Sequence, residues 1–266
     1  MKHLVVPRLP RRGSRIVVDG EQFHYLRRVR RVGEGDTLRC TDGRSTAEIL
    51  RVVGIDGESM ILERPIDPDD LETAGRGDAG NDNATGSVTL AIALLKGKKF
   101  DTAVRQATEL GIDTIVPVIT KHCVSRPTPE ELEKKRRRWI QIALEASQQS
   151  GRTILPEIAE PRLLTDLPEI IDAGRPSACA VVFHEAEQIP FPRGVPEGAE
   201  GPVSDWHALI GPEGGLAPEE ISFLAAEGWL VRRLHLPVLR AETAVIAAGA
   251  LVQHLRSEYN SRFPTP

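Results

Sequence analysis

The chain has 266 residues, of which 40% are hydrophobic, and its 34 basic and 38 acidic residues give a formal net charge of −4. This composition excludes wholesale disorder, and no apolar run approaches the ~18 residues of a membrane helix. Three widely separated cysteines (Cys40, Cys123 and Cys179) argue against a zinc site or a disulfide framework and favour the reducing cytoplasm as the location.

The N-terminal segment is rich in arginine. Eight arginines lie between residues 8 and 31 against two acids, Asp19 and Glu21, so the rest of the chain is correspondingly acidic. A basic patch on an acidic protein is typical of a face that contacts a polyanion, and a solvated surface is the alternative. The preference for arginine over lysine favours contact with RNA or another phosphate. The candidates are Arg8, Arg11, Arg12, Arg27, Arg28, Arg30 and Arg31.

Residues 1–70 have the pattern of a small β domain. Short apolar stretches separated by glycine turns predict strands over 14–19, 36–41, 46–53 and 59–63, as in a small β-barrel. Between the first two strands, residues 21–30 have the spacing of one amphipathic helix. One face of this helix carries the spaced residues Phe23, Leu26 and Arg30, together with Tyr25 and Val29, and its other face is arginine.

A change of composition divides the chain. Residues 67–87 are acidic, glycine-rich and almost free of apolar side chains, which is typical of a flexible linker. The length also suggests about two domains at ~150 residues each. We therefore predict a first domain over 1–70, a linker over 71–87 and a second domain over 88–266.

From residue 88 onward, strands and helices alternate. Apolar runs predict strands over 88–95, 112–119, 154–158, 178–183, 207–210 and 230–236. Helices are predicted over 101–110 (capped by Asp101), 129–150, 164–173, 218–227 and 242–259. This alternation predicts an α/β fold with a mostly parallel sheet and right-handed crossovers.

A glycine-rich loop follows one of the predicted strands, over residues 210–215 (Ile-Gly-Pro-Glu-Gly-Gly). It matches neither a Walker loop nor a dinucleotide-binding fingerprint. Consecutive glycines allow positive φ angles and let backbone groups approach a ligand closely, and Glu213 adds one carboxylate. A tight turn between strand and helix explains the loop equally well when it is taken alone.

A second motif, over residues 239–244, opens the last helix. Glu242 and Thr243 are explained as caps of free backbone N–H groups, but Arg240 is not. A cation at a helix N-terminus opposes the macrodipole, so a phosphate or carboxylate should compensate Arg240. The small residues that follow permit close approach of another helix, another subunit or a threaded chain.

Two other candidate functional sites can also be explained by a purely structural role. Residues 148–152 (Gln-Gln-Ser-Gly-Arg) end a long helix, where Arg152 is also explained as a cation that complements the helix dipole. His184 follows a strand and either lines a pocket or is structural. No Ser-His-Asp or Cys-His pairing has support in the sequence, and no metal is expected.

Four motifs occur in an order that resembles a known family. They are residues 96–117, 149–158, 210–215 and 239–244, and residues 23–36 add to the likeness. Together they resemble the RsmE family of ribosomal RNA uridine N3-methyltransferases, within the SPOUT (α/β-knot) superfamily. The chain departs from the family in two places: residues 234–239 (Leu-His-Leu-Pro-Val-Leu) lack a usual glycine and arginine, and 120–126 replaces an Arg-Ser-type segment.

The resemblance implies a C-terminal SPOUT α/β domain with a trefoil knot and a small N-terminal PUA-like β-barrel that helps to hold RNA. It implies S-adenosylmethionine as the cofactor, a homodimer formed through the C-terminal domain, and methylation of N3 of a uridine in 16S (small-subunit) ribosomal RNA. Two other functions stay open: a SPOUT enzyme that acts on transfer RNA, and a catalytically silent RNA-binding factor in ribosome assembly.

The resemblance also implies roles for particular residues. The catalytic candidates are Arg240, which would stabilise negative charge on uracil or grip a phosphate, and Glu213 or Glu242 as proton acceptor. Lys96, Arg126 and Arg152 join the N-terminal arginines as candidates for RNA contact. The cofactor-binding candidates are His184, Ile210, Gly211, Pro212, Gly214, Gly215, Leu234, Leu236, Val238, Leu239 and Thr243.

Overall fold

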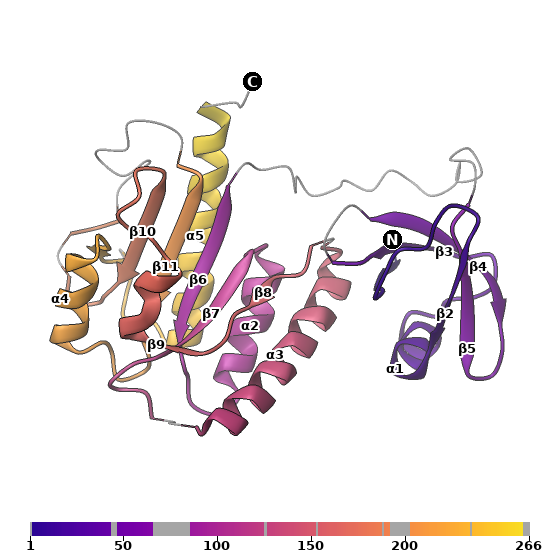
Figure 1. Ribbon diagram of the computed structural model, residues 1–266, viewed down its shortest axis with the longest axis horizontal. Helices are drawn as coiled ribbons and strands as arrows, with labels where there is room; N and C mark the ends of the chain where they lie inside the picture. Colours follow the sequence, from indigo (N-terminus) through magenta and orange to yellow (C-terminus); the bar gives the residue numbers. More distant parts are fainter. Residues whose placement is uncertain are drawn as a thin grey trace. The chain divides into compact units, whose positions relative to one another are not determined.

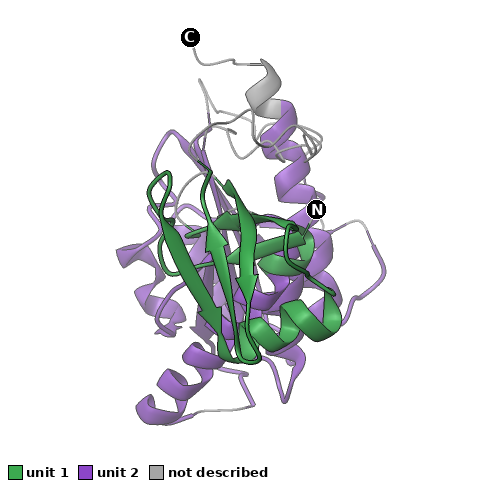
Figure 2. Cartoon of the chain, turned by 90° about the vertical axis from the view of Figure 1, so that its right-hand side faces the viewer, with its two compact units in different colours: residues 1–82, 147–155 green, residues 83–146, 156–266 purple. Residues whose placement is uncertain are grey.

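The computed structural model describes residues 2–43, 47–65, 86–124, 127–152, 154–187, 189–191, 203–234 and 236–262. The chain divides into two compact units, which Figure 2 colours separately. The first unit comprises residues 1–82 and 147–155, and the second comprises 83–146 and 156–266. Residues 147–155 thus group with the first unit, although the sequence boundaries assign them to the second domain. The linker predicted over 71–87 lies outside the described residues, apart from its last two.

The first unit contains a five-stranded sheet in the order β1-β3-β4-β5-β2. Its strands are β1 (Lys2–Val5), β2 (Arg15–Asp19), β3 (Thr37–Thr41), β4 (Glu48–Ile55) and β5 (Ser59–Glu63). β1 runs parallel to β3, and the other pairs are antiparallel. The core beside the sheet is aliphatic, with Leu4, Leu38, Leu50 and Leu62 almost fully buried. All four predicted strands are present, and β1 is an additional one.

The helix predicted over 21–30 consists of two parts. α1 (Gly20–His24) continues into η1 (Tyr25–Val29), a π-helix in which the N–H of Arg30 donates to the carbonyl of Tyr25. A π turn holds more residues than an α turn, so it changes which side chains share a face. Phe23 and Leu26 are buried as predicted, whereas Val29 is 64% exposed. The placement of Val29 on the apolar face was therefore wrong.

The second unit is built on a seven-stranded sheet (Figure 1). Its order is β12-β10-β11-β6-β7-β8, with β9 also paired to β7, and every pair is parallel, as predicted. The strands are β6 (Ser87–Ala93), β7 (Thr114–Ile119), β8 (Glu157–Ile158), β9 (Arg162–Leu163), β10 (Ala178–Phe183), β11 (Asp205–Ile210) and β12 (Leu230–Arg232).

Two predicted strands of this unit are shorter than expected. The strand predicted over 154–158 is reduced to β8, because Ile154 forms an isolated bridge with Gly43 in the first unit instead. The strand predicted over 230–236 ends at Arg232. Each of these strands lies at the border of the sheet, where one side of a strand has no partner.

Helices cover both faces of the sheet. The core on one face contains side chains of α2 (Lys99–Glu109), α3 (Pro129–Ser150) and α5 (Ala241–Arg262). The core on the other face contains those of η3 (Leu164–Glu169), a 3₁₀-helix, and α4 (Pro218–Ala226). Along β11, Ala208 and Ile210 belong to the first core and Leu209 to the second. Such burial on both sides explains the nearly continuous apolar sequence of the central strands.

The helix starts differ in how they are capped. Thr128 and Glu131 form the reciprocal pair expected at the start of α3: the Glu131 N–H donates to Thr128 Oγ1 (3.4 Å), and the Thr128 N–H donates to Glu131 Oε2 (2.8 Å). The prediction that Asp101 caps α2 was wrong, because α2 begins two residues earlier, at Lys99. Asp101 instead accepts hydrogen bonds from Arg138 and Trp139 on α3.

None of the described helices is long and apolar enough to cross a membrane.

A largely buried ion pair fixes α5 to the sheet. Arg256 Nη1 lies 2.9 Å from Asp113 Oδ2, and the same oxygen accepts the backbone N–H of Val88 at 2.8 Å. The Arg256 side chain is 9% exposed and that of Asp113 is 31% exposed. Removing one partner of such a pair leaves a poorly solvated charge behind.

We expect Arg256→Ala to lower the free energy of unfolding by about 2 kcal/mol, below the full cost of a wholly buried pair because Asp113 keeps some contact with water. Urea unfolding followed by circular dichroism measures this change. Arg137→Ala is the matched control, since Arg137 pairs with Glu133 on the exposed surface of α3. Its expected cost is below ~1 kcal/mol, and equal costs for the two variants would contradict this interpretation of the Arg256 pair.

Candidate active site

Three adjacent parallel strands end at one edge of the second unit's sheet. β10 leads into residues 184–187, β11 into 211–217, and β12 into 233–240, of which residue 235 lies outside the described part. Two adjoining cavities lie among these loops, with volumes of about 80 Å³ and 400 Å³. We call the first the apolar cavity and the second the charged cavity. The carboxyl edge of a parallel sheet is where α/β folds bind ligands.

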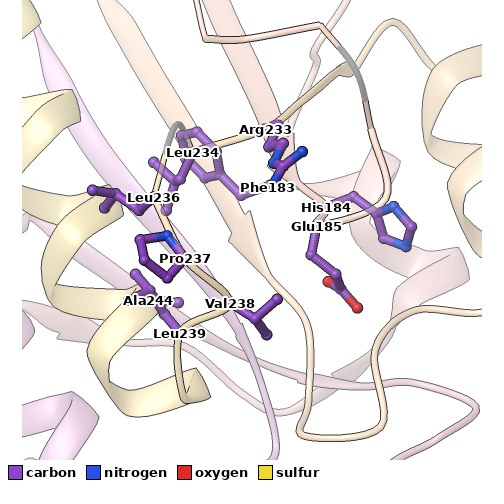
Figure 3. A pocket seen from close by; sticks show the side chains of 10 residues that line it. All are labelled: Phe183, His184, Glu185, Arg233, Leu234, Leu236, Pro237, Val238, Leu239 and Ala244. Atoms are coloured by element: carbon purple, nitrogen blue, oxygen red, sulfur yellow. The ribbon is translucent and has the colours of Figure 1, made fainter.

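The apolar cavity is formed mainly by the segment that joins β12 to α5. Figure 3 shows Leu234, Leu236, Pro237, Val238 and Leu239 along this segment, with Ala244 of α5 beside them. The Phe183 ring lies beside Leu234, and Glu185 lies across from Val238 with its carboxylate toward the opening. Arg233 and the predicted site residue His184 also line it. The cavity therefore combines an apolar wall with one carboxylate, one guanidinium and one imidazole.

The charged cavity lies between the glycine loop and the start of α5. Ile210, Gly211, Pro212, Gly215 and Leu216 form the side contributed by the loop. Leu239, Arg240, Ala241 and Ala244 form the opposite side, and Lys99 of α2 completes the wall with Glu213 and Glu185. The two motifs that the sequence singled out thus lie across one cavity, which favours a pocket over a simple turn.

The conformation of the glycine loop depends on two of its glycines. Gly215 has φ = +71°, a conformation that side chains other than glycine rarely adopt. A Cβ on Gly214 would lie 3.1 Å from the Cβ of His122, so the loop passes tightly against the segment after β7. Gly214 consequently faces His122 and, unlike its neighbours, does not line either cavity.

His122 holds the loop from the other side. Its Nδ1 lies 3.1 Å from the carbonyl oxygen of Gly214 and 3.2 Å from that of Gly215. Both carbonyl oxygens are acceptors, so we assign the proton to Nδ1, which then donates to them. The preceding residue is fixed as well, because the Lys121 N–H donates to Glu220 at 2.7 Å and the Lys121 ammonium pairs with Glu219. Sequence reasoning missed His122, and its only signal was the departure from the family in 120–126.

Glu213 is engaged by lysine. Lys99 Nζ lies 2.8 Å from Glu213 Oε1, and the Lys96 N–H donates to the same oxygen at 3.3 Å. Burial alone would raise the pKa of Glu213, but the hydrogen bonds from Lys99 and the backbone outweigh it and hold the pKa below its ordinary value. The hydrogen bond with Glu213 also raises the pKa of Lys99. The pair is therefore ionised near neutral pH.

Arg240 is exposed in the wall of the charged cavity. Its guanidinium forms no hydrogen bond or ion pair with any residue that the structure describes, while its carbonyl accepts the N–H groups of Thr243 and Ala244. A cation is thus held at the first turn of α5, open to the cavity. The sequence predicted an anion that compensates Arg240. A bound ligand could supply this anion.

Several predicted residues lie elsewhere. Glu242 and Thr243 do not line either cavity. The Oε2 atom of Glu242 is buried without a hydrogen-bond partner among the described residues, and Thr243 is exposed. Arg126 lies outside the described residues. Arg152 belongs to the first unit, where its N–H donates to the Ser147 carbonyl at the end of α3, as in a helix C-cap. The structure brings no metal-binding group of three His, Cys, Asp or Glu side chains together in the part of the chain it describes.

The arginines between residues 8 and 31 are mostly exposed. Arg27 uses its Nη1 to donate to the Val32 carbonyl at 2.6 Å, and Arg30 is half-buried. Arg15 differs from the others because it pairs with Glu63 at 2.7 Å. The remaining ones form no ion pair with a described residue: Arg8, Arg11, Arg12, Arg28 and Arg31. The predicted basic patch is therefore largely available to an external anion.

Comparison with known proteins gives two family matches and a consistent set of relatives. The model of an RNA methyltransferase domain matches residues 81–253, and that of an RNA methyltransferase PUA domain matches 18–63. The ribosomal RNA small subunit methyltransferase E of Synechocystis sp. is 32% identical over 239 residues, 88% of this chain and 71% of that protein. The protein of the same name from Mycobacterium bovis is 28% identical over 267 residues, 96% of this chain and 92% of its own.

Solved structures agree in fold. The ribosomal RNA small subunit methyltransferase E from Neisseria gonorrhoeae, bound to S-adenosyl methionine, has a TM-score of 0.78 at 21% identity, covering 96% of this chain and 98% of that one. A methyltransferase from Legionella pneumophila in complex with the same cofactor has a TM-score of 0.77 at 24% identity, over 95% of this chain and 97% of that chain. The predicted α/β fold with an N-terminal PUA unit is confirmed, and the trefoil knot stays a prediction.

Proposed function

The chain belongs to the RNA methyltransferase family, and we propose that it transfers a methyl group from S-adenosylmethionine to N3 of a uridine in 16S ribosomal RNA. The observation that carries this proposal is the placement of Arg240 across the charged cavity from the glycine loop, with no partner among the described residues. The two relatives compared above are both named as methyltransferases of small-subunit ribosomal RNA. The proposal also includes the location: we place the enzyme in the cytoplasm, where ribosomal RNA is found.

The cavities fit the proposed cofactor. The charged cavity, at about 400 Å³, lies within the ~300–1,000 Å³ range of small-molecule sites. Apolar side chains such as Leu239 and Val238 suit an adenine ring, and the carboxylates of Glu185 and Glu213 suit a cationic ligand. Backbone groups of Ile210, Gly211, Leu234, Leu236 and Leu239 are the ones we assign to its adenosine and methionine parts. When bound, S-adenosylmethionine supplies an electrophilic methyl group on a sulfonium.

The protein must favour the anion of the uracil ring, because a neutral N3–H is a poor nucleophile. The Arg240 guanidinium lines the cavity and has no partner in the described part of the chain, so we assign to it the stabilisation of negative charge on the uracil oxygens. Glu213 lines the same cavity and is our candidate acceptor for the N3 proton, although its depressed pKa and its pairing with Lys99 make it a weak base. Glu242 lines neither cavity, so we give it no part in the proton transfer.

The exposed arginines of the first unit are assigned to RNA phosphates. We expect the variant with Arg27, Arg28, Arg30 and Arg31 all changed to glutamate to weaken binding of a ribosomal RNA fragment. The slope of log K against log salt should also fall by about 0.7–0.9 for each phosphate that the variant no longer neutralises. Filter binding over a range of salt concentrations measures both quantities. Arg15→Glu is the control, because Arg15 is already paired with Glu63. Unchanged affinity of the fourfold variant would remove these arginines from the RNA-binding surface.

The homodimer and the trefoil knot also belong to this proposal. The small residues of α5 are partly explained within one chain: a Cβ on Gly249 would lie 3.1 Å from Leu110 Cδ1 and 3.3 Å from Leu90 Cδ1. Close packing of α5 on α2 and the sheet therefore accounts for this glycine. The half-buried Ala247 and exposed Ala250 on the same helix are left for contact with a second copy. Light scattering at several protein concentrations measures the oligomeric state.

The decisive test is the chemical identity of the product. The purified protein is incubated with undermethylated small ribosomal subunits and S-adenosylmethionine, and the RNA is digested for mass spectrometry of its nucleosides. N3-methyluridine is the expected product. A methylated ribose, or product on transfer RNA only, would favour the alternative SPOUT enzyme. Calorimetry that detects no binding of S-adenosylmethionine would favour the silent assembly factor.

A further inference from the structure

A third cavity lies at the same sheet edge, beyond the end of β6. Its volume is about 110 Å³, and it is bounded by the loop before α2 and by α3. The aromatic rings of Phe100 and Trp139 pack together in its wall, with centroids 4.3 Å apart. Lys98, Lys135 and Arg138 also line it, so we call it the lysine cavity. None of the residues assigned above to the cofactor belongs to it.

The cavity has an excess of positive charge. Asp101 is the only carboxylate in its lining, and both of its oxygens are engaged: Oδ2 with Arg138 Nη2 at 2.6 Å, and Oδ1 with the indole N–H of Trp139 at 3.2 Å. Asp101 thereby fixes Arg138 at the cavity. The ammonium groups of Lys98 and Lys135 are exposed and form no ion pair or hydrogen bond within the described ranges of the chain. The lysine cavity therefore lacks the anion that would balance it.

The start of α2 strengthens this imbalance. Lys98 is the residue before the first turn of α2, and no side chain caps the helix there. Lys98 and Lys99 are both cations at the positive end of a helix dipole, which is unfavourable without an anion nearby. Glu213 compensates Lys99 at 2.8 Å. No described residue does the same for Lys98, so the fold holds a second cation in an unfavourable position beside a cavity.

Two consecutive residues of the chain line the lysine cavity and the charged cavity. Lys98 lines the lysine cavity, and the next residue, Lys99, lines the charged cavity. β6 lies between β11 and β7 in the sheet, so the ends of neighbouring strands carry the two cavities. A polyanion bound along this edge would meet Arg240 and Lys99 at one cavity and Lys98, Lys135 and Arg138 at the next.

We propose that the lysine cavity binds a backbone phosphate of the substrate RNA, next to the nucleotide whose base enters the charged cavity. The inference rests on the proposed function and names a subsite within it. Its volume of about 110 Å³ is well below the ~300 Å³ at which sites for whole small molecules begin, so it suits a single group such as phosphate. Phosphate contacts of this kind position an RNA and do not read its sequence.

The test uses the full-length protein with Lys98→Glu and Lys135→Glu combined. We expect the dissociation constant for a ribosomal RNA fragment to rise about tenfold or more, and the salt dependence to weaken by the equivalent of about one to two neutralised phosphates. The KM for RNA should rise, with kcat at saturating RNA and the calorimetric affinity for S-adenosylmethionine unchanged. Both substituted side chains are exposed, and a matching urea midpoint verifies that the variant is folded.

Lys134→Glu is the matched control, because Lys134 is an exposed lysine of the same helix that does not line the cavity. A loss of RNA affinity that is confined to the double variant supports the subsite. An equal loss of RNA affinity per changed charge in the control, or no loss in either variant, overturns it. The RNA affinity is measured without turnover, so the subsite is judged even if the parent protein fails to methylate, an outcome that would instead count against the proposed function.

Discussion

Replacing Arg240 with alanine is expected to lower the rate constant for methyl transfer by roughly 10²–10³ while the affinity for S-adenosylmethionine stays close to that of the parent protein. The reason lies in the placement of Arg240, which lines the charged cavity and whose guanidinium has no partner among the described residues. A charge-stabilising group acts mainly on the transition state, so kcat should fall and the calorimetric dissociation constant should not change. Single-turnover methylation of small ribosomal subunits measures the rate constant.

Two further measurements separate this role from a structural one. Arg240→Lys keeps the charge but loses the planar, forked donor, and it should recover part of the rate. Raising the pH should partly rescue Arg240→Ala, because a more basic solution supplies the uracil anion that the arginine otherwise favours. A near-parental rate for Arg240→Ala with intact cofactor binding would remove Arg240 from the chemistry.

Ala244→Phe is expected to raise the dissociation constant for S-adenosylmethionine by about a hundredfold, equivalent to about 2.7 kcal/mol. Ala244 is half-buried on the first turns of α5, and it is one of the residues that line both the apolar and the charged cavity. A phenyl ring at this position occupies space that the ligand needs. Isothermal calorimetry measures the loss of affinity, and methylation should fall in parallel.

The matched variant for this experiment is Ala244→Ser, which adds one hydroxyl and leaves the cavity nearly open. Its affinity should remain within a few-fold of the parent protein. RNA binding by Ala244→Phe should be unchanged, because the proposed phosphate contacts lie elsewhere. If Ala244→Phe binds the cofactor as tightly as the parent protein and unfolds at the same urea concentration, the cofactor does not occupy these cavities.

Local patterns were sufficient to predict most elements of the second unit, but they missed β9 and overextended the helix predicted over 164–173, which is the 3₁₀-helix η3 (Leu164–Glu169). Central strands such as β11 are buried on both faces, so their sequence is largely apolar, with His207 as a buried exception in β11. The start of α3 was predictable because Thr128 and Glu131 interact across one helical turn. Signals of this kind lie within a few neighbouring residues, and they need no knowledge of the rest of the fold.

Features that depend on distant partners could not be predicted in this way. Asp101 has the sequence features of a helix cap, but it binds Arg138 and Trp139, some 37 and 38 residues away. The exposure of Val29 accompanies a π turn, which the spacing of apolar residues along the sequence does not predict. The pairing of Lys99 with Glu213 joins residues 114 positions apart. The motifs placed Arg240 and the glycine loop in one site only through a family resemblance.

The hydrogen bonds from His122 to the glycine loop join two segments that are far apart in the sequence. Its Nδ1 lies within hydrogen-bond distance of the carbonyl oxygens of Gly214 and Gly215, which follow His122 by 92 and 93 positions. His122 itself lines neither the apolar nor the charged cavity. A substitution at His122 would therefore act on a ligand only indirectly, through the position of the loop that forms one wall of the charged cavity.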